Sequence, residues 1–291
     1  MYKAKVGIIG TGNIGTNLLM KIARSELLEC TIFAGKNPNS PNIIRAGEMG
    51  INVSCAGIQA LLEQQDQIDI IMDATSAQSH INNKELFESM GKYMINLTPT
   101  NGELGCVPCI NWDEAIHCRE VNMITCGGQA TIPLAYAIMQ TGCEVTYIET
   151  VSTISAKSAG QATRENIDEF IETTSGAMRR FTGVEKTKAI MIINSNEPPV
   201  NMRNTIYMRL KKGDMSAICE AVSKMESRVA KYVPGYRIVL QPAMVDDILA
   251  ITLEVSGSGD FLPEYAGNLD IITCAAVEMA EKYCNKVLRK G

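Results

Sequence analysis

A glycine-rich segment near the start of the chain constrains the fold more than any other feature of the 291 residues. The apolar run over residues 4–9 predicts a buried strand, and Gly10-Thr-Gly12-Asn-Ile-Gly15 follows it directly. Apolar residues spaced three and four apart after Thr16 then indicate a helix. In such a unit the first glycine permits a tight turn, the second lets the backbone approach a pyrophosphate, and the third lets helix and strand pack together. The segment favours dinucleotide binding; the alternative is a glycine turn that serves packing alone.

The region up to about residue 125 alternates short strands with helices. Its apolar runs predict buried strands at 29–35, 51–55, 68–73 and 93–97. Helical patterns separate them at 43–49, 56–64 and 82–90. Elements that alternate at this pace predict a doubly wound parallel sheet with right-handed crossovers. We therefore expect an α/β protein whose residues 1–125 form a Rossmann domain, completed by an amphipathic C-terminal helix over 268–291.

The region after about residue 125 has a different pattern. Long alternating runs, which predict strands, lie at 143–155, 187–194, 205–212 and 247–256. Long helices are predicted between them at 164–181 and 214–231. This pattern indicates a second, α+β domain over 126–267, with larger antiparallel strands. The apolar strands also suggest that the protein is at least a dimer.

The residues after the second predicted strand leave the choice between NAD and NADP open. A carboxylate about 20 positions after the glycine turn would accept a hydrogen bond from the ribose 2′-OH and repel a 2′-phosphate. The chain has Lys36 and Asn37 there instead. Asn37 can still hydrogen-bond a hydroxyl, and Lys36 can attract a phosphate. Lys36 is equally explained as a solvated surface charge.

Cys126 is the strongest candidate for a nucleophile. A strand is predicted to end at Thr125, two glycines follow Cys126, and Pro133 stands near the start of a helical pattern. Backbone N–H groups at a helix N-terminus stabilise a thiolate and can hold an oxyanion. We therefore predict a lowered pKa for the Cys126 thiol, and we expect the glycines to let a substrate approach the backbone. The alternative is a buried structural cysteine.

Other cysteines and histidines give weaker signals. Cys106-Val-Pro-Cys109 has the spacing of a metal or redox pair, but a zinc site needs a second pair of ligands, and the pair does not open a helical pattern. His80 and His117 are the only histidines, and their spacing is not that of metal ligands. No metal site is predicted. His80 stays open as a base for Cys126, although nothing in the sequence places the two together.

The composition excludes several classes of protein. Apolar residues make up 46% and charged residues 20% of the chain, and the formal net charge is −5 without basic clusters. A nucleic-acid or anionic-membrane partner is therefore not expected. No apolar run reaches the roughly 18 residues of a spanning helix. Because the first residues lead directly into a strand, we expect no export signal, a cytoplasmic location and ten reduced cysteines.

Several motifs along nearly the whole chain resemble one enzyme family. They are Gly10-Thr-Gly-Asn-Ile-Gly-Thr16, Asp73-Ala-Thr-Ser-Ala77, Leu97-Thr-Pro99, Thr125-Cys-Gly-Gly-Gln-Ala-Thr-Ile-Pro133, Ser155-Ala-Lys-Ser-Ala-Gly160, Thr163-Arg-Glu-Asn-Ile-Asp-Glu-Phe170, Glu197-Pro-Pro199 and Tyr265-Ala-Gly-Asn-Leu-Asp-Ile271. In this order they resemble the CoA-acylating acetaldehyde dehydrogenases of aromatic meta-cleavage pathways. The cysteine motif and the Ala266–Ile271 motif are the most specific.

The resemblance implies a reaction and a set of site residues. The reaction is the conversion of a short-chain aldehyde, CoA and NAD⁺ to acyl-CoA and NADH through a cysteine thiohemiacetal and thioester. The resemblance implies a dimerising second domain and gives Cys126 and Asn204 as candidate catalytic residues. The candidate cofactor-binding residues are Gly10, Thr11, Gly12, Asn13, Ile14, Gly15, Lys36, Asn37, Thr75, Ser158, Ala159, Gly160, Gln161, Ala162, Thr163, Arg164, Glu165, Asn166 and Asn268.

The chain also departs from the family. The family usually carries aspartate at the positions of Asn204 and Asn37, and an asparagine cannot act as a base at neutral pH. The family commonly pairs with a 4-hydroxy-2-oxoacid aldolase. That partnership stays open, because the segment between Pro242 and Ile248 is shorter than in the family and the 209–216 loop differs. The alternative functions are a semialdehyde dehydrogenase that does not use CoA and a cofactor-binding homologue without turnover.

Overall fold

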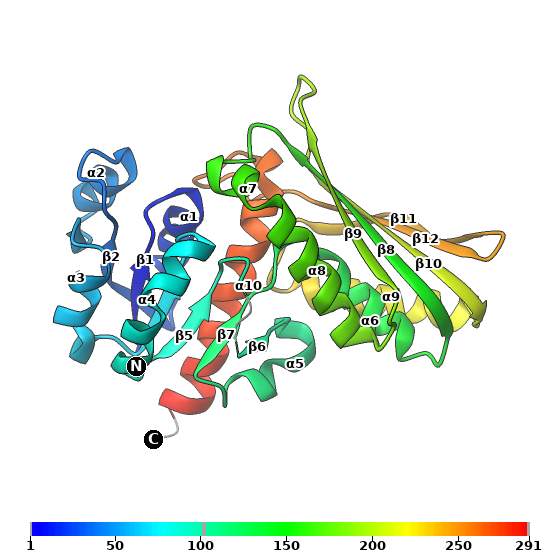
Figure 1. Ribbon diagram of the computed structural model, residues 1–291, viewed down its shortest axis with the longest axis horizontal. Helices are drawn as coiled ribbons and strands as arrows, with labels where there is room; N and C mark the ends of the chain where they lie inside the picture. The colour runs from blue at the N-terminus through cyan, green and yellow to red at the C-terminus, as the bar shows by residue number, and fades with distance from the viewer. Residues whose placement is uncertain (1, 101–102, 290–291) are drawn as a thin grey trace. The chain divides into compact units, whose positions relative to one another are not determined.

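The chain divides into two compact units, each of which has its own sheet (Figure 1). The computed structural model describes residues 2–100 and 103–289, without the side chains of Gln161 and Ala162. The first unit comprises Met1–Met123 with Thr273–Gly291, and the second comprises Ile124–Ile272. These limits lie two and five residues from the boundaries that the sequence pattern suggested.

The first unit contains a parallel sheet of seven strands, ordered β3-β2-β1-β4-β5-β7-β6. The strands are β1 (Ala4–Ile9), β2 (Leu28–Ala34), β3 (Val53–Ser54), β4 (Ile70–Asp73), β5 (Tyr93–Asn96), β6 (Leu104–Gly105) and β7 (Glu120–Asn122). Every residue of β4 and β5 is buried, as expected for strands covered on both faces. The order reverses between β1 and β4, which confirms the predicted doubly wound fold.

Helices connect these strands. They are α1 (Asn13–Ile22), α2 (Pro41–Glu48), α3 (Ile58–Glu63), α4 (Ala77–Met90) and α5 (Pro108–Ala115), with a 3₁₀ turn at Gln65–Gln67. Helix α4 starts five residues earlier than predicted because the Ser76 hydroxyl caps it by accepting a hydrogen bond from the Ser79 N–H. Helix α5 was not predicted: it begins between Cys106 and Cys109, so the statement that this pair opens no helix was wrong.

The C-terminal segment completes the first unit. Helix α10 (Gly267–Tyr283) follows a 3₁₀ turn at Glu264–Ala266 and continues as a π-helical turn at Cys284–Leu288. The Asn17 amide donates a hydrogen bond to the Thr273 hydroxyl at 2.9 Å, and the Ser25 hydroxyl donates one to Glu281 at 2.6 Å. Hydrogen bonds across 256 residues of sequence therefore join α10 to the first strands and helices of the chain.

The second unit contains a mixed sheet of five strands, ordered β11-β12-β10-β8-β9. The strands are β8 (Glu144–Ser155), β9 (Thr187–Asn194), β10 (Met202–Lys212), β11 (Tyr236–Val245) and β12 (Ile248–Val255), and the helices are α6 (Cys126–Met139), α7 (Gln161–Glu165), α8 (Ile167–Thr182) and α9 (Met215–Ala230). The prediction of antiparallel strands was wrong for β8 and β9, which are parallel because α7 and α8 cross over between them. The edge strand β11 was not predicted, because its pairing is irregular around Pro242.

One face of this sheet is covered by α6, α8 and α9 (Figure 1). Strand β10 alternates accordingly, with Asn204 and Ile206 buried and Arg203 and Tyr207 exposed. On the other face, Glu254 forms ion pairs with Arg203 at 2.9 Å and Arg237 at 2.6 Å. Burial would raise the pKa of Glu254, but the two guanidinium groups outweigh it and hold the pKa at about 2. Among the helices of the described chain, none combines the length and the apolar character that a membrane crossing requires.

Candidate active site

The turn between β1 and α1 gives its three glycines different surroundings. Gly10 has a φ of +104°, and a Cβ atom there would collide with the backbone of Ala74. A Cβ atom at Gly15 would collide with the Gly10 carbonyl. A Cβ atom at Gly12 would meet nothing within 4 Å. Gly10 and Gly15 are therefore required by packing, whereas Gly12 faces open space.

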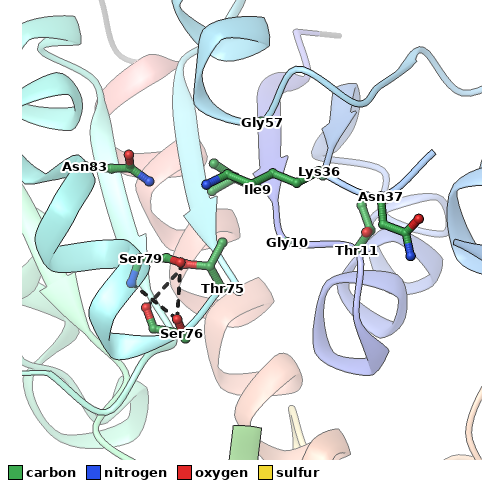
Figure 2. Close-up of a pocket in the computed structure, with 11 residues that line it drawn as sticks. Ile9, Gly10, Thr11, Lys36, Asn37, Gly57, Thr75, Ser76, Ser79 and Asn83 are labelled. Atoms are coloured by element: carbon green, nitrogen blue, oxygen red, sulfur yellow. Dashed lines mark hydrogen bonds between the residues drawn. The ribbon is translucent and has the colours of Figure 1, made fainter. Parts of the chain in front are cut away.

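A pocket of about 320 Å³ lies at the carboxyl ends of β1, β2 and β4, where the strand order reverses (Figure 2). Ligands of doubly wound sheets bind at this switch point. The pocket is lined by Ile9, Gly10, Thr11, Gly35, Lys36, Asn37, Gly57, Thr75, Ser76, Ser79 and Asn83. It therefore brings together five predicted cofactor residues from three separate turns: Gly10, Thr11, Lys36, Asn37 and Thr75.

Five polar or glycine residues of this pocket were not predicted: Gly35, Gly57, Ser76, Ser79 and Asn83. The two serines and the asparagine come from the cap and first turns of α4. A signal was present, because Ser76 and Ser79 have the spacing of a helix cap and directly follow a buried strand. Gly57 has a φ of +59°, which favours glycine, but no pattern in the sequence relates it to Lys36.

A buried ionic cluster fixes the wall of the pocket. Asp73 accepts hydrogen bonds from the N–H and the hydroxyl of Thr75, at 2.9 and 2.6 Å. Its other oxygen lies 2.8 Å from Nδ1 of His80, whose Nε2 lies 3.2 Å from Glu120. Burial would lower the pKa of His80, but the two carboxylates outweigh it and raise the pKa to about 9. His80 is thus a charged structural group held on both sides, which argues against its use as a base for Cys126.

In the second unit, Cys126 is the first residue of α6. The hydroxyl of Thr125 caps this helix by accepting a hydrogen bond from the Gly128 N–H at 2.9 Å, and it lies 2.7 Å from the Thr174 hydroxyl. Because Thr125 supplies the cap, α6 starts seven residues before Pro133, which lies inside the helix rather than near its start as predicted. Sγ of Cys126 therefore lies beside the first backbone N–H groups of a 14-residue helix.

The backbone around Cys126 is tightly constrained. Ile124 has a φ of +63°, a left-handed conformation that is unusual for a β-branched residue. A Cβ atom at Gly127 would lie 2.7 Å from both Phe170 Cζ and Ser152 Oγ, and one at Gly128 would lie 2.7 Å from an Ile124 methyl group. The two glycines therefore make room for protein side chains. The prediction that they let a substrate approach the backbone has no support here.

The environment of the Cys126 thiol differs from the prediction. Cys126 is half-buried. Burial raises the pKa of the thiol to about 12, although hydrogen bonds from the backbone N–H groups of Cys126 and Gly127 act in the opposite direction. The predicted lowering of the pKa was therefore wrong for the protein alone, because desolvation outweighs the helix N-terminus. The thiol can ionise more easily only when a positive charge or a base is brought near it.

Two buried amides in the second unit have unsatisfied polar atoms. Asn204 is fully buried, and neither its Nδ2 nor its Oδ1 makes a hydrogen bond to the described residues; the same holds for Oδ1 of Asn268. Asn204 pairs with Ser152 in the ladder of β10 and β8, on the face covered by α6, and Ser152 Oγ is the atom that a Cβ at Gly127 would meet. Asn204 therefore lies beneath the start of α6. A buried amide without a partner is costly, which points to a bound water or ligand.

The predicted cofactor segment 158–166 also belongs to the second unit. Its backbone is held locally: the Ser158 hydroxyl donates to the Ser155 carbonyl at 2.9 Å, and the Arg164 guanidinium donates to the carbonyls of Ala159 and Ala156. Gly160 precedes α7, Thr163 and Glu165 lie in α7, and Asn166 precedes α8. The side chains of Gln161 and Ala162 lie outside the described residues. The pocket of the first unit contains none of these residues.

No metal centre accompanies these sites in the described residues, since no three histidine, cysteine, aspartate or glutamate side chains there are arranged to hold an ion. Cys106 is fully buried, and burial raises the pKa of its thiol, which makes it a poor redox group.

A doubly wound sheet with an open glycine at its switch point, together with a second unit that presents a cysteine at a helix start, defines the class of nucleotide-dependent oxidoreductases. Comparisons with known proteins agree. The family model for the dimerisation domain of prokaryotic acetaldehyde dehydrogenase matches residues 126–263. The model for the NAD binding domain of D-isomer specific 2-hydroxyacid dehydrogenases matches residues 1–101.

Relatives that match nearly the whole chain identify the family within this class. The chain is 48% identical to an acetaldehyde dehydrogenase of Pectobacterium atrosepticum, covering 96% of this chain and 95% of the relative. It is 46% identical to those of Carboxydothermus hydrogenoformans (98% and 95% covered) and Geobacillus stearothermophilus (97% and 96% covered). The protein belongs to the acetaldehyde dehydrogenase family, and it is an aldehyde-acting oxidoreductase with an NAD-binding fold.

Proposed function

We propose that this protein converts a short-chain aldehyde such as acetaldehyde, together with CoA, to acyl-CoA, and that Cys126 is its nucleophile. The observation that carries the proposal is the position of a half-buried cysteine as the first residue of α6, beside free backbone N–H groups. A thiol in this position can add to a carbonyl carbon while the N–H groups stabilise the oxygen that becomes negatively charged.

The chemistry proceeds in two halves. Sγ of Cys126 bonds to the carbonyl carbon, the π electrons move to oxygen, and the thiol proton is released, which gives a thiohemiacetal. A nicotinamide bound nearby would accept the hydride from this carbon. The C=O bond then re-forms and leaves a thioester on Cys126. The CoA thiol gives up its proton and its sulfur attacks this thioester. Sγ leaves with the electron pair of its bond to carbon and takes up a proton, and acyl-CoA is released.

Asn204, which lies beneath the start of α6, would hold a reacting group without accepting a proton. Asn204 is neutral at all ordinary pH values, so its amide can donate to a carbonyl oxygen or accept from a water but cannot act as a base. Its two unpaired polar atoms supply both capacities in a buried place. The high pKa of the Cys126 thiol then means that a positive charge near Sγ would promote its ionisation.

The cofactor in this proposal is a nicotinamide dinucleotide, NAD or NADP. Gly10 to Gly15 would hold the pyrophosphate, with Gly12 making room and the N-terminus of α1 favouring negative charge. Lys36, Asn37 and Thr75 would face the adenosine half. The family resemblance assigns Ser158 to Asn166 to a segment that contacts the cofactor, and it matches Asn268 to an asparagine near the nicotinamide.

The same proposal includes assembly and location. The match to a dimerisation domain supports a homodimer formed through the second unit. A 4-hydroxy-2-oxoacid aldolase that supplies the aldehyde is a candidate partner, and a cytoplasmic location agrees with ten free cysteines.

The test measures NADH or NADPH formation from acetaldehyde, with and without CoA, for the wild type and Cys126→Ser. We expect turnover that requires CoA and Cys126. Without CoA, mass spectrometry should find one acyl group on the peptide that contains Cys126. Turnover without CoA would instead indicate a semialdehyde dehydrogenase type of reaction. Cofactor binding without any turnover would indicate a homologue that has lost catalysis.

A further inference from the structure

The adenosine end of the pocket contains a cation and no anion. Among the eleven lining residues of the described chain there is no aspartate or glutamate, and Lys36 is the only charged side chain. Asp73, two residues before Thr75, is fully buried and is engaged by Thr75 and His80. A ligand in this pocket therefore meets a positive potential that no carboxylate in its lining offsets.

Lys36 is placed for a ligand rather than for a protein partner. Its Nζ makes no ion pair or hydrogen bond with residues 2–100 or 103–289, although its stem is ordered against Gly57. A Cβ atom at Gly57 would lie 3.3 Å from Lys36 Cγ and 3.4 Å from Cε, so a glycine there gives the lysine stem its room. Figure 2 shows the side chain extended across the pocket, with the amine pointing toward the side formed by α4.

Asn37 reinforces the preference for an anion. Its Oδ1 accepts a hydrogen bond from the Asn39 N–H at 3.0 Å, within the turn that leads into α2. This bond engages one lone pair of Oδ1 and leaves Nδ2 as a donor. Asn37 therefore offers a neutral amide donor to a phosphate oxygen, in a place where a carboxylate would offer acceptors only and a negative charge.

We propose that Lys36 and Asn37 form a 2′-phosphate site and that this enzyme prefers NADP(H) to NAD(H). The inference rests on the proposed function only in that a dinucleotide binds at the Gly10–Gly15 turn, and it does not depend on the reaction at Cys126. A 2′-phosphate carries about −1.5 to −2 charges at pH 7 and three acceptor oxygens. The Lys36 ammonium and the Asn37 amide match this group in charge and in hydrogen-bonding type.

The experiment measures the binding of NADP⁺ and NAD⁺ by isothermal titration calorimetry to the full-length protein. For the wild type we expect NADP⁺ to bind at least tenfold more tightly than NAD⁺. In Lys36→Met the affinity for NADP⁺ should fall about tenfold, with the NAD⁺ affinity within twofold of the wild type. The matched control is Lys92→Met, which removes a lysine outside the pocket and should change neither affinity.

Asn37→Asp tests the same site by introducing a negative charge that should favour NAD⁺. A carboxylate there repels the phosphate and accepts from the hydroxyl, so NADP⁺ affinity should fall and NAD⁺ affinity should rise. The pH dependence gives a further readout. The second pKa of a phosphate monoester is about 6, so NADP⁺ affinity should rise between pH 5 and pH 7.5 more than NAD⁺ affinity does, and Lys36→Met should remove most of that difference.

The possible outcomes separate the two proposals. If NAD⁺ binds more tightly than NADP⁺ in the wild type, or if Lys36→Met leaves both affinities unchanged, the 2′-phosphate site is wrong while dinucleotide binding stands. If neither dinucleotide binds to a folded protein, the proposed function of the pocket itself is wrong.

Discussion

Two glycine-rich turns in this protein look alike in sequence and differ in what their glycines do. Both join the end of a strand region to the first residues of a helix, one before α1 and one at the start of α6. At the first turn, Gly12 faces open space, and a ligand can enter. At the second turn, Phe170, Ser152 and Ile124 fill the space beside Gly127 and Gly128. A missing side chain thus leaves space for the proposed cofactor in one unit, and in the other it lets side chains pack closely beside the proposed nucleophile.

The largest expected effect tests whether the second turn supplies the nucleophile while the first turn binds the dinucleotide. Cys126→Ser should lower aldehyde-dependent turnover by about 10³-fold or more, because a serine hydroxyl is a far weaker nucleophile than a thiol at neutral pH. Dinucleotide affinity should stay within twofold, since the pocket belongs to the first unit. Steady-state kinetics and calorimetry give the two readouts. Substantial turnover in the variant would remove Cys126 from the proposed chemistry.

The second effect tests the packed turn. Gly127→Ala should lower the free energy of unfolding by about 1–2 kcal/mol, because its methyl group would collide with Phe170 and Ser152 and the helix propensity of alanine only partly offsets that cost. The control is Gly176→Ala in α8, where a Cβ atom meets nothing within 4 Å; it should raise stability by about 0.5–1 kcal/mol. Urea unfolding followed by circular dichroism measures both. Equal stability of the two variants would contradict the packing role of Gly127.

The third effect tests the open turn. Gly12→Ala should lower dinucleotide affinity about tenfold, because the methyl group enters the space of the pyrophosphate, while the melting temperature stays unchanged. Gly47→Ala in α2, with only one ordinary contact at 3.7 Å, should leave the affinity as it is. If Gly12→Ala binds like the wild type, the open space at this turn does not receive the cofactor.

The smallest effect distinguishes the two units by pH. The pKa of His80 is raised from 6.5 to about 9, so its stabilisation is complete below pH 6.5 and is lost as the pH rises through 9. The pKa of Glu254 is lowered from 4.5 to about 2, so its stabilisation is present above pH 4.5 and is lost as the pH falls toward 2. Between pH 6.5 and 9 the alkaline loss comes from His80 in the first unit, because the raised pKa of the Cys126 thiol in the second unit adds a loss only above pH 9. At acid pH Glu254 contributes from the second unit, and Glu120, whose pKa is also lowered, adds to the loss from the first.

The measurement is urea unfolding between pH 3 and pH 9, followed by circular dichroism for the whole protein and by the fluorescence of Trp112, the single tryptophan, for the first unit. Stability should fall by on the order of 1 kcal/mol between pH 6 and pH 9. His80→Gln should flatten this dependence. Glu254→Gln should leave it unchanged and flatten the acidic one instead. If the alkaline dependence persists in His80→Gln, a group other than His80 causes it.

The sequence predicted the first unit better than the second. Buried parallel strands alternate with helices so regularly that their order follows, and the glycine turn marks the pocket. Strand β11 was missed because an edge strand with Pro242 and largely exposed residues lacks an apolar pattern. The parallel pairing of β8 and β9 was missed because strand direction depends on the path of the connecting helices.

The candidate sites, too, could be predicted only in part, because some of their properties depend on the folded surroundings. The position of Cys126 at a helix start follows from local sequence, but the high pKa of its thiol depends on how much of the second unit surrounds it. Asn204 was found through family resemblance alone, and only the structure shows that both of its polar atoms lack partners in the described chain. The strained Ile124 has no sequence signal, because its side chain is an ordinary strand residue.

The hydrogen bonds from α10 to Asn17 and Ser25 have a consequence for how the protein is made. A ribosome releases the chain from its N-terminus, yet the first unit acquires these partners only when residues 273–289 have emerged. All residues of the second unit emerge before then. During synthesis the second unit can therefore finish folding first, and the nucleotide-binding half of the molecule waits for the last part of the chain.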